Sequence, residues 1–342
     1  MGYFDQEPKK RKLDFFNMED EWDSLDNALK ASKLVLVSGL RRYGKTSLIL
    51  TYLNEKNLDY IYLDCRLLPS TMISIKSFLD LIEYELNRKS WAKKILSNIE
   101  GVSIGSLGIR FKEKKEKLML NILQALEHKI LVIDEAQELR RSNYRFDSLI
   151  AYAYDHLNLK MILSGSKVGL LYKFLRIDDP EAPLYGRPFI EVKVKRLSED
   201  KARDFLMKGF EQEGIKVEKK VIDEGIERFD GIIGWLTYFG FSISRSRENV
   251  ETIHNKAAKL AISELEHALK IYGIGELRYK EALKTIAILN LARWSQIKRA
   301  IEAKLGILPN NTLSVILKNL VDSGFVEKLN SEYRIADPIL QY

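Results

Sequence analysis

The fold is decided by residues 34–47, which read LVLVSGLRRYGKTS. Residues 39–46 fit the pattern G-x-x-x-x-G-K-[S/T] at every fixed position. Four apolar residues precede the motif and predict a short buried strand, and an apolar pattern with helical spacing starts at Leu48. The motif therefore lies in the turn between a strand and a helix, which is where a phosphate-binding loop occurs. A glycine-rich turn that contains Lys-Thr by chance is the alternative.

The chemistry of such a loop follows from its residue types. Glycines allow the backbone to fold around a phosphate chain, and inward-facing amides and the N-terminus of the next helix favour its negative charge. Lys45 is expected to neutralise the β- and γ-phosphates, and the Thr46 hydroxyl to ligate Mg²⁺. The predicted nucleotide contacts are Gly39, Arg42, Tyr43, Gly44, Lys45, Thr46 and Ser47.

A second strand ends in two acids. Residues 129–135 read KILVIDE, so four apolar residues lead directly into Asp134 and Glu135. Carboxylates often end strands simply because they prefer solvent. Downstream of a complete phosphate-binding loop, however, Asp134 is predicted to hold Mg²⁺ and Glu135 to polarise the water that attacks the γ-phosphate. This pair favours hydrolysis over transfer to a second substrate.

Two further features are candidates for contacts with the γ-phosphate. Residues 161–166, MILSGS, predict a parallel strand from which Ser164 or Ser166 reaches this phosphate or its water, unless both are plain turn residues. Arg187 precedes an alternating strand pattern at 189–194. It is predicted beside the mouth of the site, where it stabilises the γ-phosphate within one chain or across a subunit interface. A solvated turn arginine is the alternative.

The sequence says less about which residues contact the base of the nucleotide. Phe15 and Phe16 lie shortly before the loop strand, and they either flank an adenine ring or belong to the core. No Asn-Lys-x-Asp motif for guanine appears in the right half of the nucleotide-binding domain.

The C-terminal half is predicted to be helical and to end in a different unit. Helices are expected at 198–213, 218–229 and 249–272, and then at 279–289, 295–304 and 311–323, followed by strands at 325–329 and 333–335. Three helices and a β-hairpin are typical of a winged helix. Its helix from Asn311 either enters a DNA major groove or docks on a protein, and its single Lys318 supplies little charge for phosphate. The predicted domains are 1–196, 197–274 and 275–342.

Bulk composition limits the class of protein. The 342 residues are 46% hydrophobic and 30% charged, which describes a soluble globular chain. No apolar run approaches the ~18 residues of a membrane span, and no signal peptide opens the chain. The one cysteine, Cys65, fits a reducing cytosol, so a cytoplasmic protein without a membrane partner is expected. A net charge of +7 (55 minus 48) allows an anionic partner without requiring one.

Taken together, these motifs resemble the archaeal ATPases of the STAND class, which are AAA+-related P-loop proteins. The resemblance rests on FFN at 15–17, GLRRYGKTS, LVIDEAQ, LSGS, PLYGR and the terminal winged helix. It implies an α/β fold with an ASCE-type sheet in the order 5-1-4-3-2, a helical lid and a winged helix, with ATP or ADP and Mg²⁺ as ligands. Met18 stands where the family usually has Arg, and the glycine motif at 231–236 lacks a proline often found in related lids.

Three functions are compatible with these expectations. The first is a slow Mg²⁺-dependent ATPase in which the nucleotide state repositions the winged helix, with nucleotide-dependent self-association and a DNA or protein partner as further expectations. The second is an initiator-like or regulatory DNA-binding protein that ATP gates. The third is a scaffold that ADP stabilises and that has negligible turnover.

Overall fold

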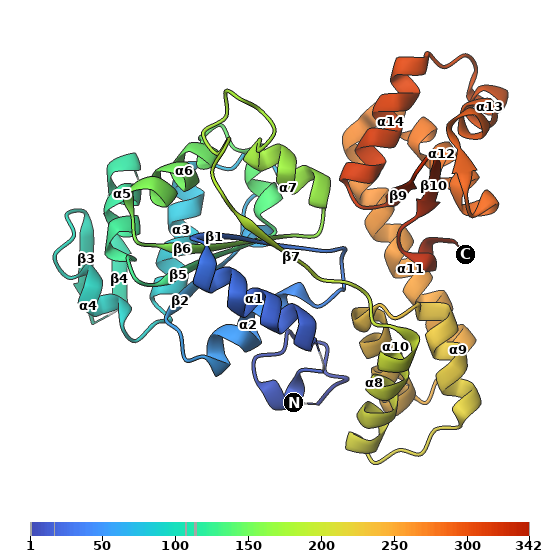
Figure 1. The fold of residues 1–342 in the computed structure, drawn as a ribbon, viewed down its shortest axis with the longest axis horizontal. Helices are drawn as coiled ribbons and strands as arrows, with labels where there is room; N and C mark the ends of the chain where they lie inside the picture. Colours follow the sequence, from blue (N-terminus) through green and yellow to red (C-terminus); the bar gives the residue numbers. More distant parts are fainter. Residues whose placement is uncertain (1, 17, 107, 113–114, 342) are drawn as a thin grey trace.

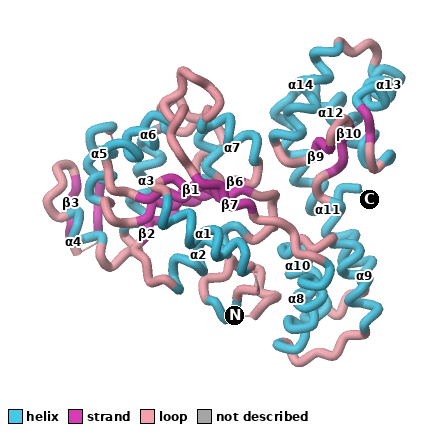
Figure 2. Tube along the Cα trace, viewed as in Figure 1, coloured by secondary structure: helices cyan, strands magenta, loops and turns pink. Residues whose placement is uncertain are grey.

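The computed structural model describes residues 2–16, 18–106, 108–112 and 115–341, so Asn17 of the FFN motif lies outside the described residues. The described chain folds into an α/β part, a helical bundle and a C-terminal unit (Figure 1). Figure 2 shows most of the strands in the first part, whereas helices occur in all three parts.

The strands and helices of the structure have the following bounds. The strands are β1 (Leu34–Ser38), β2 (Tyr60–Asp64), β3 (Val102–Gly105), β4 (Gly108–Phe111), β5 (Ile130–Asp134), β6 (Lys160–Gly165), β7 (Ile190–Lys193), β8 (Ala292–Arg293), β9 (Val326–Leu329) and β10 (Glu332–Ile335). The α-helices are α1 (Glu19–Ala31), α2 (Lys45–Glu55), α3 (Ile75–Leu86), α4 (Ala92–Leu96), α5 (Glu116–Ala125), α6 (Phe146–His156), α7 (Val168–Leu175), α8 (Glu199–Gln212), α9 (Lys219–Phe229), α10 (Ile233–Ser246), α11 (Val250–Leu269), α12 (Glu276–Leu289), α13 (Trp294–Leu305) and α14 (Asn310–Asp322). Short 3-10 helices are η1 (Lys12–Asp14), η2 (Cys65–Leu67), η3 (Ala136–Arg141), η4 (Lys270–Gly275) and η5 (Pro338–Gln341).

The main sheet has five parallel strands in the order β7-β1-β6-β5-β2. Numbered along the chain, these strands give the order 5-1-4-3-2, as the family resemblance implies. Because the strands are parallel, the loops that follow β1, β5 and β6 meet at one edge of the sheet. The phosphate-loop motif and the acid pair are therefore neighbours, although they lie far apart in the sequence.

Helices cover both faces of this sheet, and the side chains of β1 point alternately into the apolar core on each face. Leu34 and Leu36 belong to one apolar core, which α3, α5, α6 and α7 also form. Val35 and Val37 point to the opposite face and join a second core with α1 and α2. This second core continues into the bundle of α8 to α11, so the sheet and the bundle share apolar packing. The boundaries predicted after residues 196 and 274 stay predictions.

The C-terminal unit is a winged helix. Helices α12, α13 and α14 pack around a third apolar core, and β9 and β10 form the predicted hairpin. β8 completes a three-stranded sheet by pairing with β10. The sequence pattern did not reveal β8, because two residues are too few for an alternating pattern.

The winged helix docks against the α/β part through the end of α14. Asp322 forms a 2.5 Å ion pair with Lys173 of α7. A Cβ added at Gly169 would lie 2.5 Å from the Cα of Asp322, so the two helices approach closely there. Among the described residues, none of the helices combines the length and apolar character needed to cross a bilayer.

Candidate functional site

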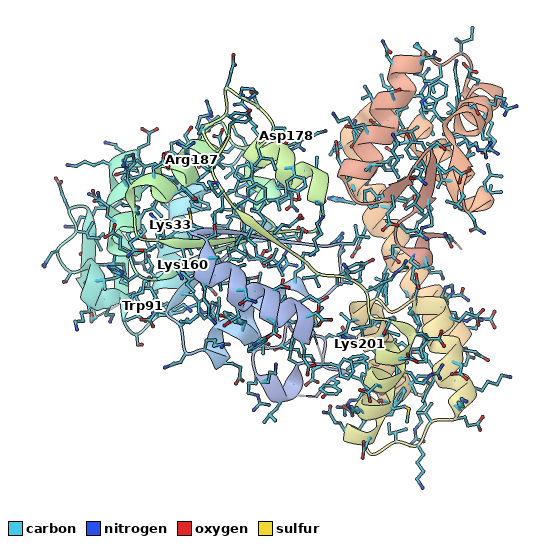
Figure 3. The ribbon with its side chains drawn as sticks, in the orientation of Figure 1. Lys33, Trp91, Lys160, Asp178, Arg187 and Lys201 are labelled. Atoms are coloured by element: carbon cyan, nitrogen blue, oxygen red, sulfur yellow. The ribbon has the colours of Figure 1, made fainter. Side chains whose placement is uncertain are left out.

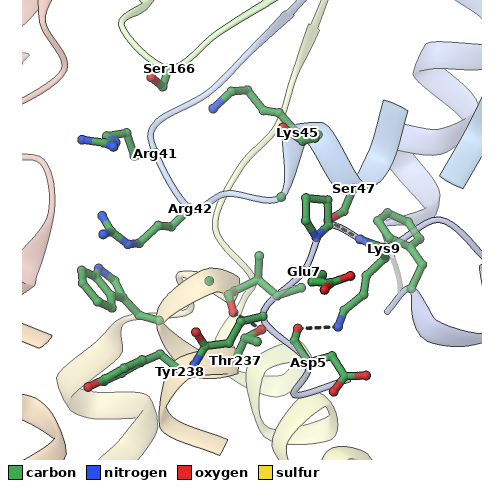
Figure 4. Close-up of a pocket in the computed structure, with 18 of the residues that line it drawn as sticks. Asp5, Glu7, Lys9, Arg41, Arg42, Lys45, Ser47, Ser166, Thr237 and Tyr238 are labelled. Atoms are coloured by element: carbon green, nitrogen blue, oxygen red, sulfur yellow. Dashed lines mark hydrogen bonds between the residues drawn. The ribbon is translucent and has the colours of Figure 1, made fainter. Parts of the chain in front are cut away.

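A pocket of about 550 Å³ opens at the carboxyl edge of the sheet. It is lined by an N-terminal segment, the motif loop, the loops after β5 and β6, and helix α10 of the bundle, together with Arg66 after β2 and Leu260 of α11. Figure 4 shows Lys45 and Ser166 on one side of this pocket and Thr237 and Tyr238 on the other. The pocket therefore lies between the α/β part and the bundle.

The motif loop has the backbone that its glycines predict. Gly44 has φ 90° in the left-handed region and caps α2. At Gly39 a Cβ would lie 2.5 Å from the carbonyl oxygen of Val194, so no larger residue fits. Arg42, Thr46 and Ser47 also line the pocket. The Tyr43 side chain instead lies in a small cavity shared with the winged helix, so only its backbone remains a candidate contact.

Lys45 is 5% exposed although it carries a charge. Its Nζ donates hydrogen bonds to the carbonyl oxygens of Gly39 (2.7 Å) and Leu40 (2.8 Å). Burial lowers the pKa of this ammonium, while the nearby carboxylates of Glu135 and Asp134 act in the opposite direction. An anionic ligand in the pocket would favour the charged form.

Asp134 is 1% exposed and accepts hydrogen bonds from several groups. Thr46 Oγ1 donates to its Oδ2 at 2.8 Å, and the hydroxyl groups of Tyr62 and Ser164 also donate to this carboxylate. A carboxylate beside a hydroxyl fits Mg²⁺, which prefers oxygen ligands. Among the described residues, no group of three or more His, Cys, Asp or Glu side chains is arranged to hold a metal ion.

The two candidate serines have different positions. Ser164 is fully buried, its Oγ donates to Asp134 and it does not line the pocket, so of the two serines Ser166 is the better placed candidate for a contact with the γ-phosphate. Ser166 does line the pocket, and its Oγ donates to Glu135 Oε2 at 2.7 Å. Ser164 lies within β6, whereas Ser166 follows the end of this strand at Gly165, so the two serines have different neighbours.

Glu135 lines the pocket from a left-handed backbone position, φ 52° and ψ 44°. Its Oε2 accepts hydrogen bonds from Ser166 and from Gln137 Nε2. Sequence reasoning missed Gln137, although it stands only two residues after Glu135. A Cβ added at Gly165 would lie 2.6 Å from Gln137 Oε1, so glycine at that position gives this side chain room.

Arg187 is not beside the mouth of the pocket. It lies before β7, near the amino end of the sheet, and forms hydrogen bonds to Asp155 Oδ1 (2.9 Å) and Oδ2 (2.6 Å). Figure 3 places it on the same side of the sheet as Lys33, which immediately precedes β1. The expectation that it contacts the γ-phosphate within one chain is therefore wrong; a contact across a subunit interface stays a prediction.

The sequence left open whether Phe15 and Phe16 flank the adenine ring or belong to the core, and their positions are compatible with both. They line the pocket, and they are also buried in the core. Phe16 packs edge-on against Phe205 of α8, and Phe15 lies against Trp22. Met18 lines the pocket beside Gly44, which is where the family resemblance leads one to expect an arginine.

The bundle contacts the motif loop directly, through the glycine motif at 231–236. Gly234 N donates to the carbonyl oxygen of Arg42 at 2.9 Å, and the Arg42 guanidinium lies 4.0 Å from the ring centre of Trp235. The same guanidinium forms two hydrogen bonds with Glu264 of α11, at 2.7 and 3.0 Å. Trp235 Nε1 in turn donates to Asp337 Oδ2 at 2.9 Å.

Asp337 belongs to the segment that follows β10 of the winged helix. Burial raises the pKa of its carboxyl group, and the hydrogen bond from Trp235 acts in the opposite direction. A continuous set of contacts therefore connects the motif loop, through Arg42 and Trp235, to the C-terminal unit.

Comparison with known families gives two matches. A family described as an ATPase domain predominantly from Archaea matches residues 15–238. A second family, described as the C-terminal winged helix-turn-helix domain of MCM protein, matches residues 273–336. No curated protein matches the chain.

Solved structures also resemble this chain. The Walker-type ATPase of Pyrococcus abyssi is 34% identical, with a TM-score of 0.85 over 99% of this chain and 98% of that one. The RuvB Holliday junction branch migration motor of Thermotoga maritima is 16% identical, with a TM-score of 0.48 over 97% and 95%. The replication initiator DnaA, bound to AMPPCP and single-stranded DNA, is 13% identical, with a TM-score of 0.44 over 92% of each chain.

Proposed function

Because the chain belongs to the family of ATPase domains found predominantly in Archaea and is an ATP-hydrolysing enzyme, we propose that it is a slow, Mg²⁺-dependent switch of STAND or AAA+ type. ATP binds in the pocket at the carboxyl edge of the sheet, and hydrolysis repositions the winged helix relative to the α/β part. The observation that carries this proposal is the contact of the motif-loop residue Arg42 with the bundle, continued by Trp235 to Asp337.

The catalytic part of the proposal assigns roles to residues that meet at the pocket. Lys45 neutralises the β- and γ-phosphates, and Thr46 with Asp134 holds Mg²⁺, which adds positive charge at the transferring phosphoryl group. Glu135 orients and polarises the attacking water. Ser166 holds the Glu135 carboxylate and lies where it can contact the γ-phosphate. These roles agree with the burial of Lys45 and Asp134.

The switching part rests on competition for two arginines. Arg41 and Arg42 both line the pocket, and both pair with Glu264, at 3.1 and 2.7 Å. A triphosphate in the pocket brings negative charge that competes with Glu264 for these guanidinium groups. ATP and ADP therefore differ in how strongly they draw the arginines away from α11, and such a differential contact is what a ligand-driven switch requires. In this proposal Arg41, and not Arg187, is the arginine that contacts the γ-phosphate within one chain.

A Trp235→Phe variant tests the connection to the winged helix. It keeps an aromatic ring under Arg42 but removes the donor to Asp337, so this half-buried carboxylate loses a hydrogen bond, at a cost of about 1 kcal/mol. We expect ATP binding and turnover within about threefold of wild type. Hydrogen exchange of residues 326–341 should become faster, and it should no longer differ between ADP and a non-hydrolysable ATP analogue.

Trp91→Phe is the matched control, because Lys129 lies over the Trp91 ring as Arg42 lies over Trp235. This control should retain nucleotide-dependent exchange in the winged helix. The switch proposal is contradicted if wild-type protein shows the same exchange with both nucleotides. The Trp235 connection alone is contradicted if Trp235→Phe behaves like the control.

A protein partner for the winged helix is favoured over DNA by its exposed residues. The outward positions of α14 are Asn310, Asn311, Ser314, Val315 and Lys318, with a single cation among them. Val315 is 55% exposed, and Ile307, in the turn before α14, is 88% exposed. Apolar side chains at the tip suit a protein surface, whereas duplex recognition depends on several phosphate contacts. Self-association that depends on the nucleotide stays a prediction.

Binding to duplex DNA measured across a salt series distinguishes the two kinds of partner. With one lysine on α14, we expect affinity only in the non-specific range, a Kd of about 10⁻⁴ to 10⁻⁶ M. Lys318→Ala should then reduce the salt slope by about one. Nanomolar, sequence-specific binding that increases with ATP would favour a DNA-binding regulator instead. A protein with tightly held ADP and negligible turnover would favour the scaffold.

A further inference from the structure

Residues 5–9 form one wall of the nucleotide pocket, and they lie ahead of the part of the chain that the ATPase family covers. Asp5 to Lys9 line the pocket. In Figure 4, Asp5, Glu7 and Lys9 lie between Ser47 of helix α2 and Thr237 of helix α10. The wall therefore spans from the α/β part to the bundle.

The wall is held at the bundle by Phe4. This side chain is 2% exposed, and its ring packs at 4.9 Å from that of Phe210 and 5.7 Å from that of Phe205. Two glycines complete the socket: a Cβ at Gly209 would lie 2.3 Å from the ring, and a Cβ at Gly240 would lie 2.2 Å from it. Both glycines occupy helix interiors, where glycine is unfavourable. Each helix therefore carries a destabilising residue at the position that admits Phe4.

The other end of the wall is held at the motif helix by Lys9. Its backbone N–H donates to Ser47 Oγ at 3.1 Å, only two residues after Lys45. Its ammonium is buried and donates to the carbonyl oxygens of Gly2 (2.8 Å) and Asp5 (2.6 Å). These bonds close residues 2–5 into a compact turn that presents Phe4 to its socket.

From this arrangement we infer that Phe4 is a positioning residue for nucleotide binding, because it fixes residues 5–8 as the wall that retains the nucleotide. The inference rests on the proposed function of the pocket, and it goes further by making retention depend on the helical bundle. The wall is attached to α8 and α10 through Phe4 and to α2 through Lys9. Movement of the bundle therefore either withdraws Phe4 from its socket or displaces the wall.

Steady-state ATP hydrolysis and the release rate of fluorescent ADP, measured on full-length Phe4→Ala, test this inference. A wall that is no longer preorganised should raise KM for ATP and accelerate ADP release by about tenfold each, because a displaced binding group loses much of its effect. The kcat should stay within about threefold of wild type, since Phe4 does not touch the reacting groups. Phe4→Leu, which refills only part of the socket, should show a smaller change of the same kind, with ADP release still measurably faster than in the wild type.

Phe78→Ala is the matched control, because Phe78 is also 2% exposed but belongs to the core on the opposite face of the sheet. It should lower the melting temperature without changing KM or ADP release. The inference is overturned if Phe4→Ala retains wild-type KM and release, or if Phe78→Ala changes them equally. If Phe4→Ala does not fold, Phe4→Leu still decides, because unchanged release in that variant overturns the inference. Failure of the wild-type protein to bind ATP would instead overturn the proposed function.

Discussion

Glu135→Gln is expected to bind ATP with wild-type affinity and to hydrolyse it about 10²- to 10³-fold more slowly. Glutamine has the shape of glutamate, and its amide oxygen can still accept the hydrogen bond from Ser166 Oγ. It cannot attract the proton of an attacking water as a carboxylate does, so only the chemical step should be lost. Calorimetry with ATP at low temperature measures binding, and phosphate release in a single turnover measures the chemical step.

Glu191→Gln is the matched control for this variant. Glu191 of β7 also accepts a hydrogen bond from a serine hydroxyl, Ser38 Oγ at 2.6 Å, at the end of β1, but it does not line the pocket. Its substitution should leave single-turnover hydrolysis within about threefold of wild type. Wild-type hydrolysis by Glu135→Gln would exclude this residue as the water-activating group. A matching loss in Glu191→Gln would mean that the assay reports general damage.

The sequence specified the phosphate-binding half of the pocket because strand ends are local features. A buried apolar strand followed by Gly39 to Ser47 places the loop, and a second such strand places Asp134. In a parallel sheet, both strands end at the same edge, so the two motifs had to meet there. The 2.8 Å contact of Thr46 with Asp134 follows from that geometry.

The same rule explains why the prediction for Arg187 was wrong. Loops that follow parallel strands reach the carboxyl edge, whereas a residue that precedes a parallel strand starts from the amino edge. Arg187 precedes β7, which pairs in parallel with β1, so it lies at the end of the sheet away from the motif loop. Its partner Asp155, near the end of α6, belongs to that same edge. The family resemblance suggested a role that the chain's own topology does not support within one molecule.

The half of the pocket formed by the N-terminal segment and the bundle could not be predicted in detail, because it depends on contacts between distant parts of the chain. Phe4 is buried only because Gly209 and Gly240, on two helices of the bundle, leave room for its ring. Trp235 reaches Asp337, which is 102 residues further along the chain. Neither contact has a periodic or motif signal. Tertiary packing alone brings these residues together, so the structure was required to find them.

Lys45→Ala is expected to reduce affinity for ATP and for ADP by about 100-fold. The ammonium is the buried cation of the motif loop, and charge-assisted hydrogen bonds to phosphate in a desolvated pocket are stronger than neutral ones. Its loss also leaves the carbonyl oxygens of Gly39 and Leu40 without the bonds that hold the loop in shape. Calorimetric titration with each nucleotide in the presence of Mg²⁺ measures the effect.

Two contributions to that loss can be separated, because β1 carries a similar lysine at its other end. Lys33 Nζ also donates to two main-chain carbonyl oxygens, those of Tyr154 (3.1 Å) and Leu157 (2.9 Å), but at the amino edge of the sheet. If Lys45 acts only by supporting its loop, the affinity lost by Lys45→Ala should not depend on salt. Lys33→Ala should then lower the melting temperature by a similar amount and keep its nucleotide affinity. If Lys45 neutralises phosphate charge, only Lys45→Ala loses affinity, and its deficit should shrink as added salt screens the phosphate contacts of the wild type. Wild-type ATP affinity retained by Lys45→Ala would contradict the site itself, because no other side chain of the loop is both buried and cationic within the described residues.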